Sequence, residues 1–355
     1  MKRTKKIICG IILLLIVSII IICAAVVLSD IRDAATSGRA PAALVNESCA
    51  TKYPVVIAHH WGPPRHREKD AKGNTLEYFY RPVTEVLRRN GADVQVAVYT
   101  HDYDTTPARA RELKKFIYSQ YIDNRAYMSQ WMRKHPGEKF KVNLVGHSQG
   151  CQDSRYMISN EGMAELTASW TGLSGESRGT PMADIGIAAY DYLVPEALEA
   201  RLFRAMSPDT LGSREQVHRF IESVRCLTED YMRNEGDYGP GGRLEGRGYK
   251  ADYAPGVYYQ NWAAKVKWMP SDWSGLYLLW KYVQLRRGDN DIYTPVSSQI
   301  HDTKYVVNRG ILQGEDWCAG VHHMAFTGSL NQANPGFGQE QFWIDLLADL
   351  RARGF

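Results

Sequence analysis

Apolar and polar residues alternate along the chain with two different periods, and together they predict strands separated by helices. Short apolar or alternating runs typical of strands lie at Pro54–Ala58, Asp93–Tyr99 and Val142–Val145. Helical spacing extends over Leu76–Asn90 and over the long polar stretch Thr106–Lys134. Strands separated by helices of this length predict an α/β fold, with a mostly parallel sheet covered by helices on both faces.

An amphipathic helix is predicted to begin at Ser213. Ser213 and Gln216 have the spacing of a capping box, in which two side chains bond free N–H groups at a helix N-terminus. One side of the segment is apolar, and this stripe consists of Val217, Phe220, Ile221, Val224 and Tyr231. The segment is either a mobile lid over an apolar site or an ordinary surface helix docked on the domain. Periodicity alone favours the docked helix.

The N-terminal region contains a long apolar run with a basic flank. No charged residue occurs from Ile7 to Leu28, and Lys2, Arg3, Lys5 and Lys6 precede this run. At 1.5 Å per residue such a helix can cross a bilayer with its basic end in the cytoplasm. Residues 1–28 are therefore predicted to be a basic stub and transmembrane signal-anchor, 29–50 a tether, and 51–355 an extracytoplasmic domain, periplasmic or extracellular. The alternative is a cleaved signal peptide and a secreted protein.

Charge and cysteine content limit the partners of the exported part. The net charge of the 355-residue chain is +4, and the four basic residues at the N-terminus account for it. The remainder is formally neutral, so we expect no nucleic-acid partner. Cys49, Cys151, Cys226 and Cys318 are an even number, which permits one or two disulfides in an oxidising compartment. Their wide spacing is not that of a metal site.

The chemically most informative motif is Gly146-His-Ser148-Gln-Gly150, which directly follows the strand predicted at Val142–Val145. In a Gly-x-Ser-x-Gly turn between a strand and a helix, the serine lies in strained backbone and the glycines leave room for the tight crossing. The turn presents the serine hydroxyl above the sheet, where a histidine and a substrate carbonyl both reach it. Ser148 is therefore the predicted nucleophile of a serine hydrolase.

The histidine and the acid of a catalytic triad are expected after Ser148, in the order serine, acid, histidine. Of the downstream histidines, His218 lies in the amphipathic helix and His301 follows the best acid too closely. His322 and His323 remain, in a loop before a final helix.

The acid is expected after the apolar run at residues 276–285. We interpret this run as leading into the end of a strand, where the acid lies. Asp291 is the first choice and Asp289 the fallback, although either is also typical of a solvated turn.

Backbone N–H groups are expected to stabilise the oxyanion of the reaction. One donor is Gln149, directly after the nucleophile, and the other is Trp61, in the loop after the first strand. The adjacent pair His59-His60 suggests a metal site as an alternative, but neighbouring residues rarely bind one ion together and no carboxylate is near in the sequence. We expect no metal there.

With these residues placed, the chain from Tyr53 to Gly328 resembles the secreted bacterial triacylglycerol lipases of the pseudomonad type, in the α/β-hydrolase superfamily. The matching segments are the opening strand and oxyanion loop at Tyr53–His59, the elbow at Lys141–Gly150 with Arg155-Tyr156, the post-elbow loop at Ser174–Thr180, a hairpin at Gly256–Tyr259, the acid loop with Asn290, Asp291, Pro295, Ser297 and Ser298, and the histidine loop at Val321–His323.

The resemblance implies further roles. It favours His323 over the fallback His322 as the catalytic base, and it places Ser213–Tyr231 within a lid or cap at about residues 191–248, which reverses the preference from periodicity. In the family a carboxylate two residues after the histidine helps to bind a structural calcium ion, and this chain has Ala325 there. We therefore expect no cofactor, with calcium suggested by the resemblance alone.

These observations predict a serine carboxylester hydrolase, a lipase or esterase, that cleaves lipid or other acyl esters through an acyl-enzyme. Ser148 attacks, His323 moves the proton, Asp291 orients the histidine, and the N–H groups of Trp61 and Gln149 hold the oxyanion. Two alternatives use the same fold: a serine acyltransferase with this triad, and a catalytically inactive protein that binds a partner. The expected partners are an ester substrate and, through residues 7–28, a membrane.

Overall fold

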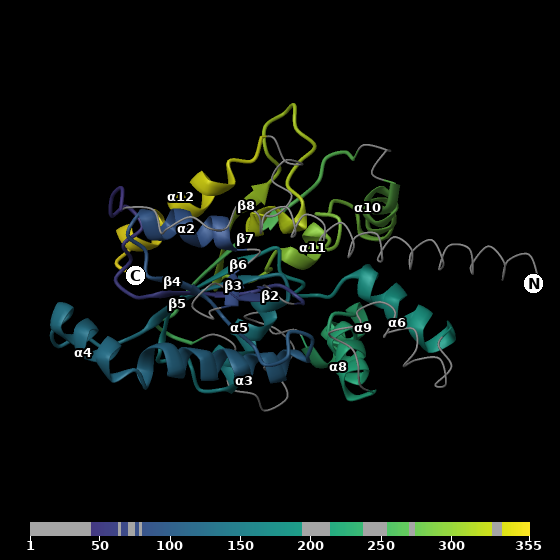
Figure 1. Cartoon of the computed structure of the whole chain (residues 1–355). Coiled ribbons are helices and arrows are strands. Elements are labelled where there is room, and N and C mark those ends of the chain that lie inside the picture. The colour runs from purple at the N-terminus through teal and green to yellow at the C-terminus, as the bar shows by residue number, and fades with distance from the viewer. Residues whose placement is uncertain are drawn as a thin grey trace, which may run out of the picture.

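The computed structural model describes residues 44–62, 65–69, 75–77, 80–193, 214–236, 254–269, 274–328 and 336–355. At its centre is a six-stranded sheet in the order β4-β1-β5-β6-β7-β8, in which all neighbours are parallel (Figure 1). Its strands are β1 (Val55–Ala58), β4 (Val94–Val96), β5 (Val142–His147), β6 (Thr167–Leu173), β7 (Tyr258–Ala264) and β8 (Val306–Leu312). A separate antiparallel pair consists of β2 (Arg65–Lys69) and β3 (Thr75–Glu77).

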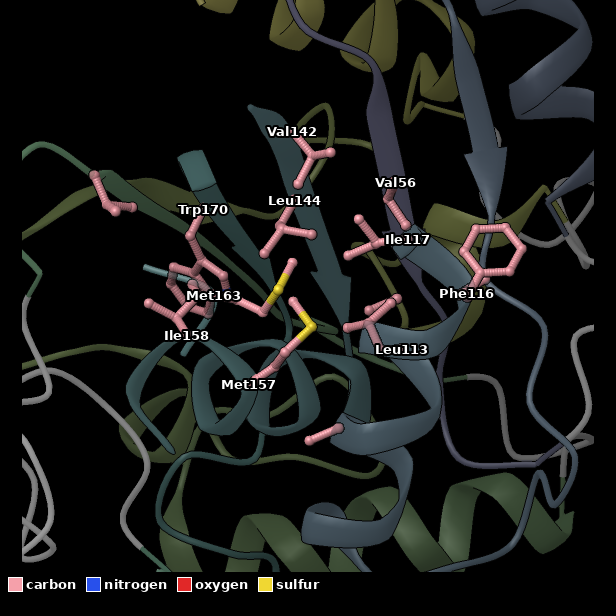
Figure 2. Close-up of a cluster of buried hydrophobic side chains, with 14 of the residues drawn as sticks. Val56, Leu113, Phe116, Ile117, Val142, Leu144, Met157, Ile158, Met163 and Trp170 are labelled. Carbon is pink, nitrogen blue, oxygen red and sulfur yellow. The ribbon is translucent and has the colours of Figure 1, made fainter. Parts of the chain in front are cut away.

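Helices cover both faces of this sheet, because successive side chains of β1 point to opposite faces and are apolar on both. Val56 and Ala58 pack into one core, while Val55 and Ile57 pack into the other. The first core lies under α3 (Thr106–Ile117), α4 (Arg125–Lys134) and α5 (Gln149–Asn160), and the second under α2 (Arg81–Arg89) and α12 (Gln339–Ala352) (Figure 1). Figure 2 shows the first core, where Leu113 of α3 lies near Val56 and Leu144 of the sheet.

The remaining helices follow the sheet strands that carry the site loops. They are α6 (Pro181–Leu193), α8 (Arg214–Arg225), α9 (Glu229–Tyr231), the π-helix η2 (Met232–Gly236), α10 (Ser274–Arg287), α11 (Val296–Gln299) and the 3₁₀-helix η4 (His323–Thr327). The apolar stripe of α8 is docked in this structure, because Val217 and Ile221 pack against Ile187 of α6. Ser213, the expected cap of this helix, and most of the expected cap region outside α6, α8 and α9 lie outside the described residues.

Two of the predicted helices differ from the structure for local reasons. The helix expected at Leu76–Asn90 begins only at Arg81, with Pro82 in its first turn. Proline lacks an N–H and clashes with the carbonyl four residues earlier, so a helix starting at Leu76 does not continue through it. The stretch Thr106–Lys134 is divided by a π-helix at Tyr118–Ile122, after which Asn124 caps α4 by accepting a hydrogen bond from the Tyr127 N–H.

The apolar run at residues 276–285, interpreted as leading to a strand end, belongs to helix α10 instead. A short apolar run does not distinguish a buried helix from a buried strand. The strand that precedes the acid loop is β7, which the resemblance assigned to a hairpin at Gly256–Tyr259 and which is parallel to β6 and β8.

The predicted transmembrane helix is the part of the fold class that we correct. Within the described ranges, no helix combines the length and the apolar character that a bilayer crossing requires. Ile7–Leu28, on which the signal-anchor prediction depended, lies outside the described residues, as does residue range 29–43 of the tether. The fold as described therefore gives this prediction no support.

The four cysteines expected in the exported part are free thiols. Cys49, Cys151, Cys226 and Cys318 are all buried, and none of them forms a disulfide. The disulfides that their even number permits are absent from the part of the chain described.

Candidate active site

The strand-to-helix turn at Ser148 has the strained geometry that the motif requires. Ser148 lies between β5 and α5 with φ 57° and ψ −130°, a conformation that L-residues rarely adopt. A Cβ atom on Gly150 would lie 2.0 Å from the carbonyl oxygen of Ala58, and one on Gly146 would lie 2.6 Å from the Cα of Cys151. The two glycines therefore allow α5 to approach β1 and β5 closely enough to form the turn.

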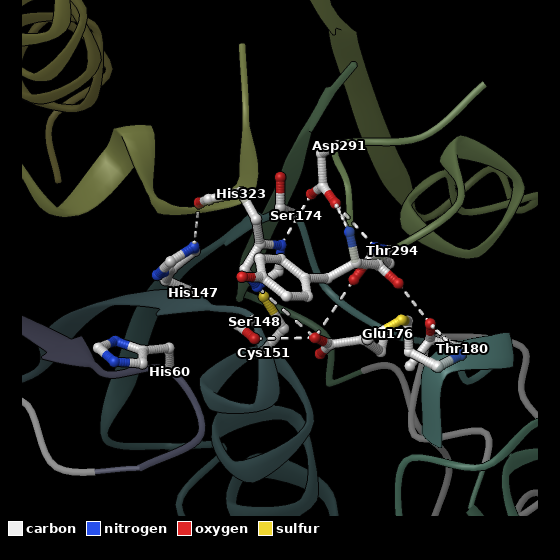
Figure 3. Close-up of polar contacts among 12 residues, drawn as sticks. His60, His147, Ser148, Cys151, Ser174, Glu176, Thr180, Asp291, Thr294 and His323 are labelled. Carbon is white, nitrogen blue, oxygen red and sulfur yellow. Dashed lines mark hydrogen bonds and ion pairs between the residues drawn. The ribbon is translucent and has the colours of Figure 1, made fainter. Parts of the chain in front are cut away.

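His323 and Asp291 form a buried pair beside this turn (Figure 3). His323 Nδ1 lies 2.8 Å from Asp291 Oδ2, and the His323 backbone N–H donates to the Asp291 carbonyl over 2.9 Å. The other carboxylate oxygen accepts from the N–H groups of Tyr293 at 3.2 Å and Thr294 at 2.8 Å. These bonds fix the carboxylate, and the carboxylate in turn fixes which nitrogen of the imidazole faces Ser148.

The charge on Asp291 also governs the protonation of His323. Burial alone lowers the pKa of this histidine, but the charge and hydrogen bond of Asp291, together with the charge of Glu176, outweigh burial and raise the pKa above its ordinary value. The imidazolium that a serine hydrolase forms in its transition state is therefore stabilised at this position.

A second carboxylate, that of Glu176, lies in the same cluster. The Ser148 hydroxyl donates to Glu176 Oε1 over 2.8 Å, and the same oxygen is 3.7 Å from His323 Nε2. Glu176 belongs to the loop after β6, directly beside the elbow strand in the sheet, since His147 pairs with Leu173. Burial raises the pKa of this carboxyl group, although His323 and Ser148 act in the opposite direction.

Sequence reasoning placed Glu176 in the post-elbow loop at Ser174–Thr180 but gave it no role. The available signal was its position, because it follows the strand next to the nucleophile strand at the carboxyl edge of a parallel sheet. Side chains at such positions converge on the site whatever their distance in sequence.

The fallback residues lie in different surroundings. The Asp289 side chain is 58% exposed and forms an ion pair with Lys265 over 2.9 Å, so it faces solvent rather than the histidine. His322 is buried, but Asp291 bonds to His323 and not to it. His301 is buried beside Trp170 and Ser177, and His218 lies on the exposed side of α8.

The loop at residues 59–62, where the oxyanion donor Trp61 is expected, follows β1 and lies against the turn at Ser148. The close approach of Gly150 to Ala58 and His59 brings Gln149, the first residue of α5, next to this loop. The Trp61 indole N–H donates to the Ser223 hydroxyl of α8 over 2.8 Å, and its ring lies 5.1 Å from that of Phe220. Helix α8 therefore packs directly on the loop that carries the expected oxyanion donor Trp61.

Buried histidines beneath the site form a hydrogen-bonded chain with a tyrosine. The Tyr80 hydroxyl lies 3.0 Å from His60 Nδ1 and 2.8 Å from His147 Nδ1, and His147 Nε2 lies 2.9 Å from the His323 carbonyl oxygen. Burial, with the charge of His323, lowers the pKa of His60 to about 3 and that of His147 well below its ordinary value. Both rings are therefore neutral near pH 7, and they support the site without adding charge.

Within the described ranges, the site shows no cluster of metal-binding side chains. Among the described residues, no group of three or more His, Cys, Asp or Glu side chains is arranged to hold one. His59 Nδ1 lies 2.8 Å from the His60 carbonyl oxygen, so its ring takes part in the loop structure. Ala325, at the position where the family has a calcium-binding carboxylate, is fully buried.

The fold and part of the sequence have known counterparts, although no family model matches the chain. Over 141 residues the chain is 29% identical to the triacylglycerol lipase of Pseudomonas fragi, a match that covers 39% of this chain and 40% of that protein. Over 152 residues it is 30% identical to the triacylglycerol lipase of Burkholderia plantarii, covering 42% of this chain and 37% of that protein. The chain thus matches less than half the length of these relatives.

A solved structure extends the similarity to most of the chain. The mature lipase BlEst2 of Bacillus licheniformis superposes with a TM-score of 0.51 at 16% identity, covering 86% of this chain and 96% of that one. At this identity the likeness establishes the fold alone, which is that of the α/β-hydrolases. The resemblance to bacterial triacylglycerol lipases predicted from the sequence is therefore confirmed, in sequence over part of the chain and in fold over most of it.

Proposed function

We propose that this protein is a serine carboxylester hydrolase that cleaves lipid esters. The observation that carries the proposal is the Asp291–His323 pair, with 2.8 Å between Oδ2 and Nδ1, placed beside a serine held in strained backbone at a strand-to-helix turn. The similarity to enzymes named triacylglycerol lipase supports a lipid ester as the substrate.

In the proposed reaction, Ser148 Oγ attacks the carbonyl carbon of the ester, and its proton passes to His323 Nε2. The electron pair of the carbonyl moves onto oxygen, where the N–H groups of Trp61 and Gln149 stabilise the negative charge. Collapse of this intermediate breaks the bond to the alcohol, which takes the proton from His323, and leaves an acyl-Ser148 ester. Water then repeats the sequence and releases the fatty acid. Asp291 retains its charge throughout and stabilises the imidazolium.

Turnover of p-nitrophenyl butyrate by the full chain tests the proposal. Ser148→Ala is expected to reduce the rate by about 10⁴-fold or more and to abolish labelling by a fluorophosphonate probe. Ser119→Ala is the matched control, because the Ser119 hydroxyl lies in the π-helix after α3, where it donates to the Phe116 carbonyl and accepts from the Gln120 amide, away from the site. Undiminished turnover in Ser148→Ala, with the control unchanged, contradicts the proposed function.

A further inference from the structure

Glu176 adds a second carboxylate to a serine–histidine–aspartate arrangement in which Asp291 already bonds the histidine. Its side chain is buried, and Oε1 accepts hydrogen bonds from Ser148 Oγ at 2.8 Å and from Thr294 Oγ1 at 3.3 Å (Figure 3). The second oxygen, Oε2, is buried without a hydrogen-bond partner among the described residues. The Ser148 hydroxyl makes its hydrogen bond to this carboxylate, and the described structure has none from Ser148 to His323.

The charged groups around His323 are few and can be named. Asp291 faces Nδ1 at 2.8 Å, and Glu176 faces Nε2 at 3.7 Å. The His147 ring lies 5.0 Å from that of His323, and the uncharged Tyr293 ring lies 5.4 Å away. His147 and, behind it, His60 are neutral near pH 7 because burial lowers both pKa values.

Behind Glu176 lie two further titratable groups. The Cys151 thiol stays neutral, because burial raises its pKa, and Asp153 is paired with Arg109. The imidazole is thus enclosed by two carboxylates, one on each nitrogen.

We propose that Glu176 is a further catalytic residue, which holds the Ser148 hydroxyl before attack and stabilises protonated His323 from the side opposite Asp291. This inference rests on the proposed function. During attack the hydroxyl proton leaves its hydrogen bond with Glu176 and passes to His323 Nε2, while Oγ forms the bond to the carbonyl carbon. The Nε2–H then lies beside the carboxylate, which keeps its charge. The proton later goes to the departing alcohol, so Glu176 neither gains nor loses a proton over the cycle.

This arrangement has a consequence for the pH profile. Attack needs neutral His323, and an opposite charge within about 4–6 Å raises the pKa of a histidine by about 1 unit or more. Replacing the carboxylate by the uncharged amide of Glu176→Gln removes that contribution. The acidic limb of the kcat/KM profile should therefore move down by about 1 pH unit. The plateau at high pH should fall about tenfold, because one pKa unit corresponds to a factor of ten. The kcat/KM profiles of the wild type and Glu176→Gln should converge at low pH. There the lower plateau is offset by the larger fraction of neutral His323 in the variant.

A purely structural role for Glu176 predicts a different profile. Loss of packing lowers the plateau but leaves the acidic limb at the same pH. The control is Glu85→Gln, because Glu85 lies on the exposed side of α2 and is paired with Arg81. This substitution should change neither the plateau nor the position of the acidic limb.

The deciding measurement is an NMR titration of the His323 imidazole in the full chain, because it does not depend on turnover. We expect a pKa lower by about 1 unit in Glu176→Gln than in the wild type and in Glu85→Gln. An unchanged His323 pKa in folded Glu176→Gln overturns the inference even if the enzyme is an active hydrolase. Absence of Ser148-dependent turnover in the wild type overturns the proposed function instead.

A second variant covers the case in which Glu176→Gln does not fold. Thr294→Val removes one hydrogen-bond donor from Oε1 and leaves the carboxylate charge in place. The carboxylate then becomes a better acceptor for the proton on His323, so the His323 pKa should rise by a few tenths of a unit. A fall or no change contradicts the inference.

Discussion

Arg109 and Asp153 form an ion pair with 2.7 Å between Nε and Oδ2, in which neither side chain has any exposed surface. Arg109 belongs to α3, and Asp153 belongs to α5, the helix that begins directly after the proposed nucleophile Ser148. The second guanidinium nitrogen donates to the carbonyls of His59 at 2.8 Å and His60 at 3.0 Å. One side chain therefore holds the loop at residues 59–62 in a fixed position relative to helix α5.

Replacing Arg109 should destabilise the protein strongly. Arg109→Met leaves the Asp153 carboxylate buried without its partner and removes the donors to the carbonyls of Asp102, His59 and His60. The loss is expected to cost about 3–5 kcal/mol of unfolding free energy. Urea unfolding followed by circular dichroism measures the change. Arg111→Met is the control, because that side chain is 54% exposed and 3.8 Å from Glu161, and should cost at most about 1 kcal/mol. Equal stability of the two variants would disprove the bridging role of Arg109.

Local patterns in the sequence were enough for the elements that depend on local chemistry. The apolar run before Gly146, the glycines around Ser148 and the apolar run of β1 each reflect a constraint within a few residues, and the strands and the turn appear where these patterns predict them. By contrast, the apolar run at residues 276–285 predicts a strand end but forms helix α10. A buried helix and a buried strand both contain such a run, so the pattern does not distinguish them.

The roles of Glu176 and Arg109 could not be predicted from local patterns. Glu176 meets Ser148 across 28 sequence positions, and Arg109 meets Asp153 across 44. The Glu176 contact depends on the pairing of β5 with β6, and the Arg109 contact depends on the packing of α3 against α5. No short sequence motif contains this information. A charged residue in sequence is usually at the surface, and only the packed structure shows that these two are not.

Gly150 should not tolerate even the smallest side chain. In Gly150→Ala the new Cβ would lie 2.0 Å from the Ala58 carbonyl oxygen, a backbone atom that moves only if β1 or α5 shifts. We expect a loss of about 1–3 kcal/mol in stability. Ester turnover should also fall, because residues 59–62, which carry the proposed oxyanion donor Trp61, follow β1. Gly338→Ala provides the comparison, since its nearest atom would be 3.9 Å away and its effect should be small. Wild-type stability and activity in Gly150→Ala would show that this close approach is not needed.

The two candidate acids should differ sharply in their effect on turnover. Asp291→Asn removes the charge that fixes the tautomer of His323 and stabilises its protonated form, so kcat for p-nitrophenyl butyrate should fall by about 10⁴-fold. Asp289→Asn removes only a surface ion pair with Lys265 and should leave kcat within about twofold. A larger loss in Asp289→Asn than in Asp291→Asn would reverse the assignment.

His301 should contribute to the acid sensitivity of the fold. Burial, with the nearby charges of Arg155 and Arg178, lowers the pKa of this histidine to about 3, whereas the unfolded chain has a value of about 6.5. Between these values the unfolded state binds a proton that the folded state does not. The stability contributed by neutral His301 is therefore complete above about pH 6.5 and is lost as the pH falls towards 3.

The test compares the wild type with His301→Gln, because other buried groups also titrate and their contributions cancel in the difference. Glutamine binds no proton, so the decrease in unfolding free energy between about pH 7.5 and 4.5 should be smaller in the variant by about 2–3 kcal/mol. Urea unfolding at the two pH values gives the four free energies. If both proteins lose the same stability on acidification, His301 is protonated in the folded state, and its burial against Trp170 does not keep the ring neutral.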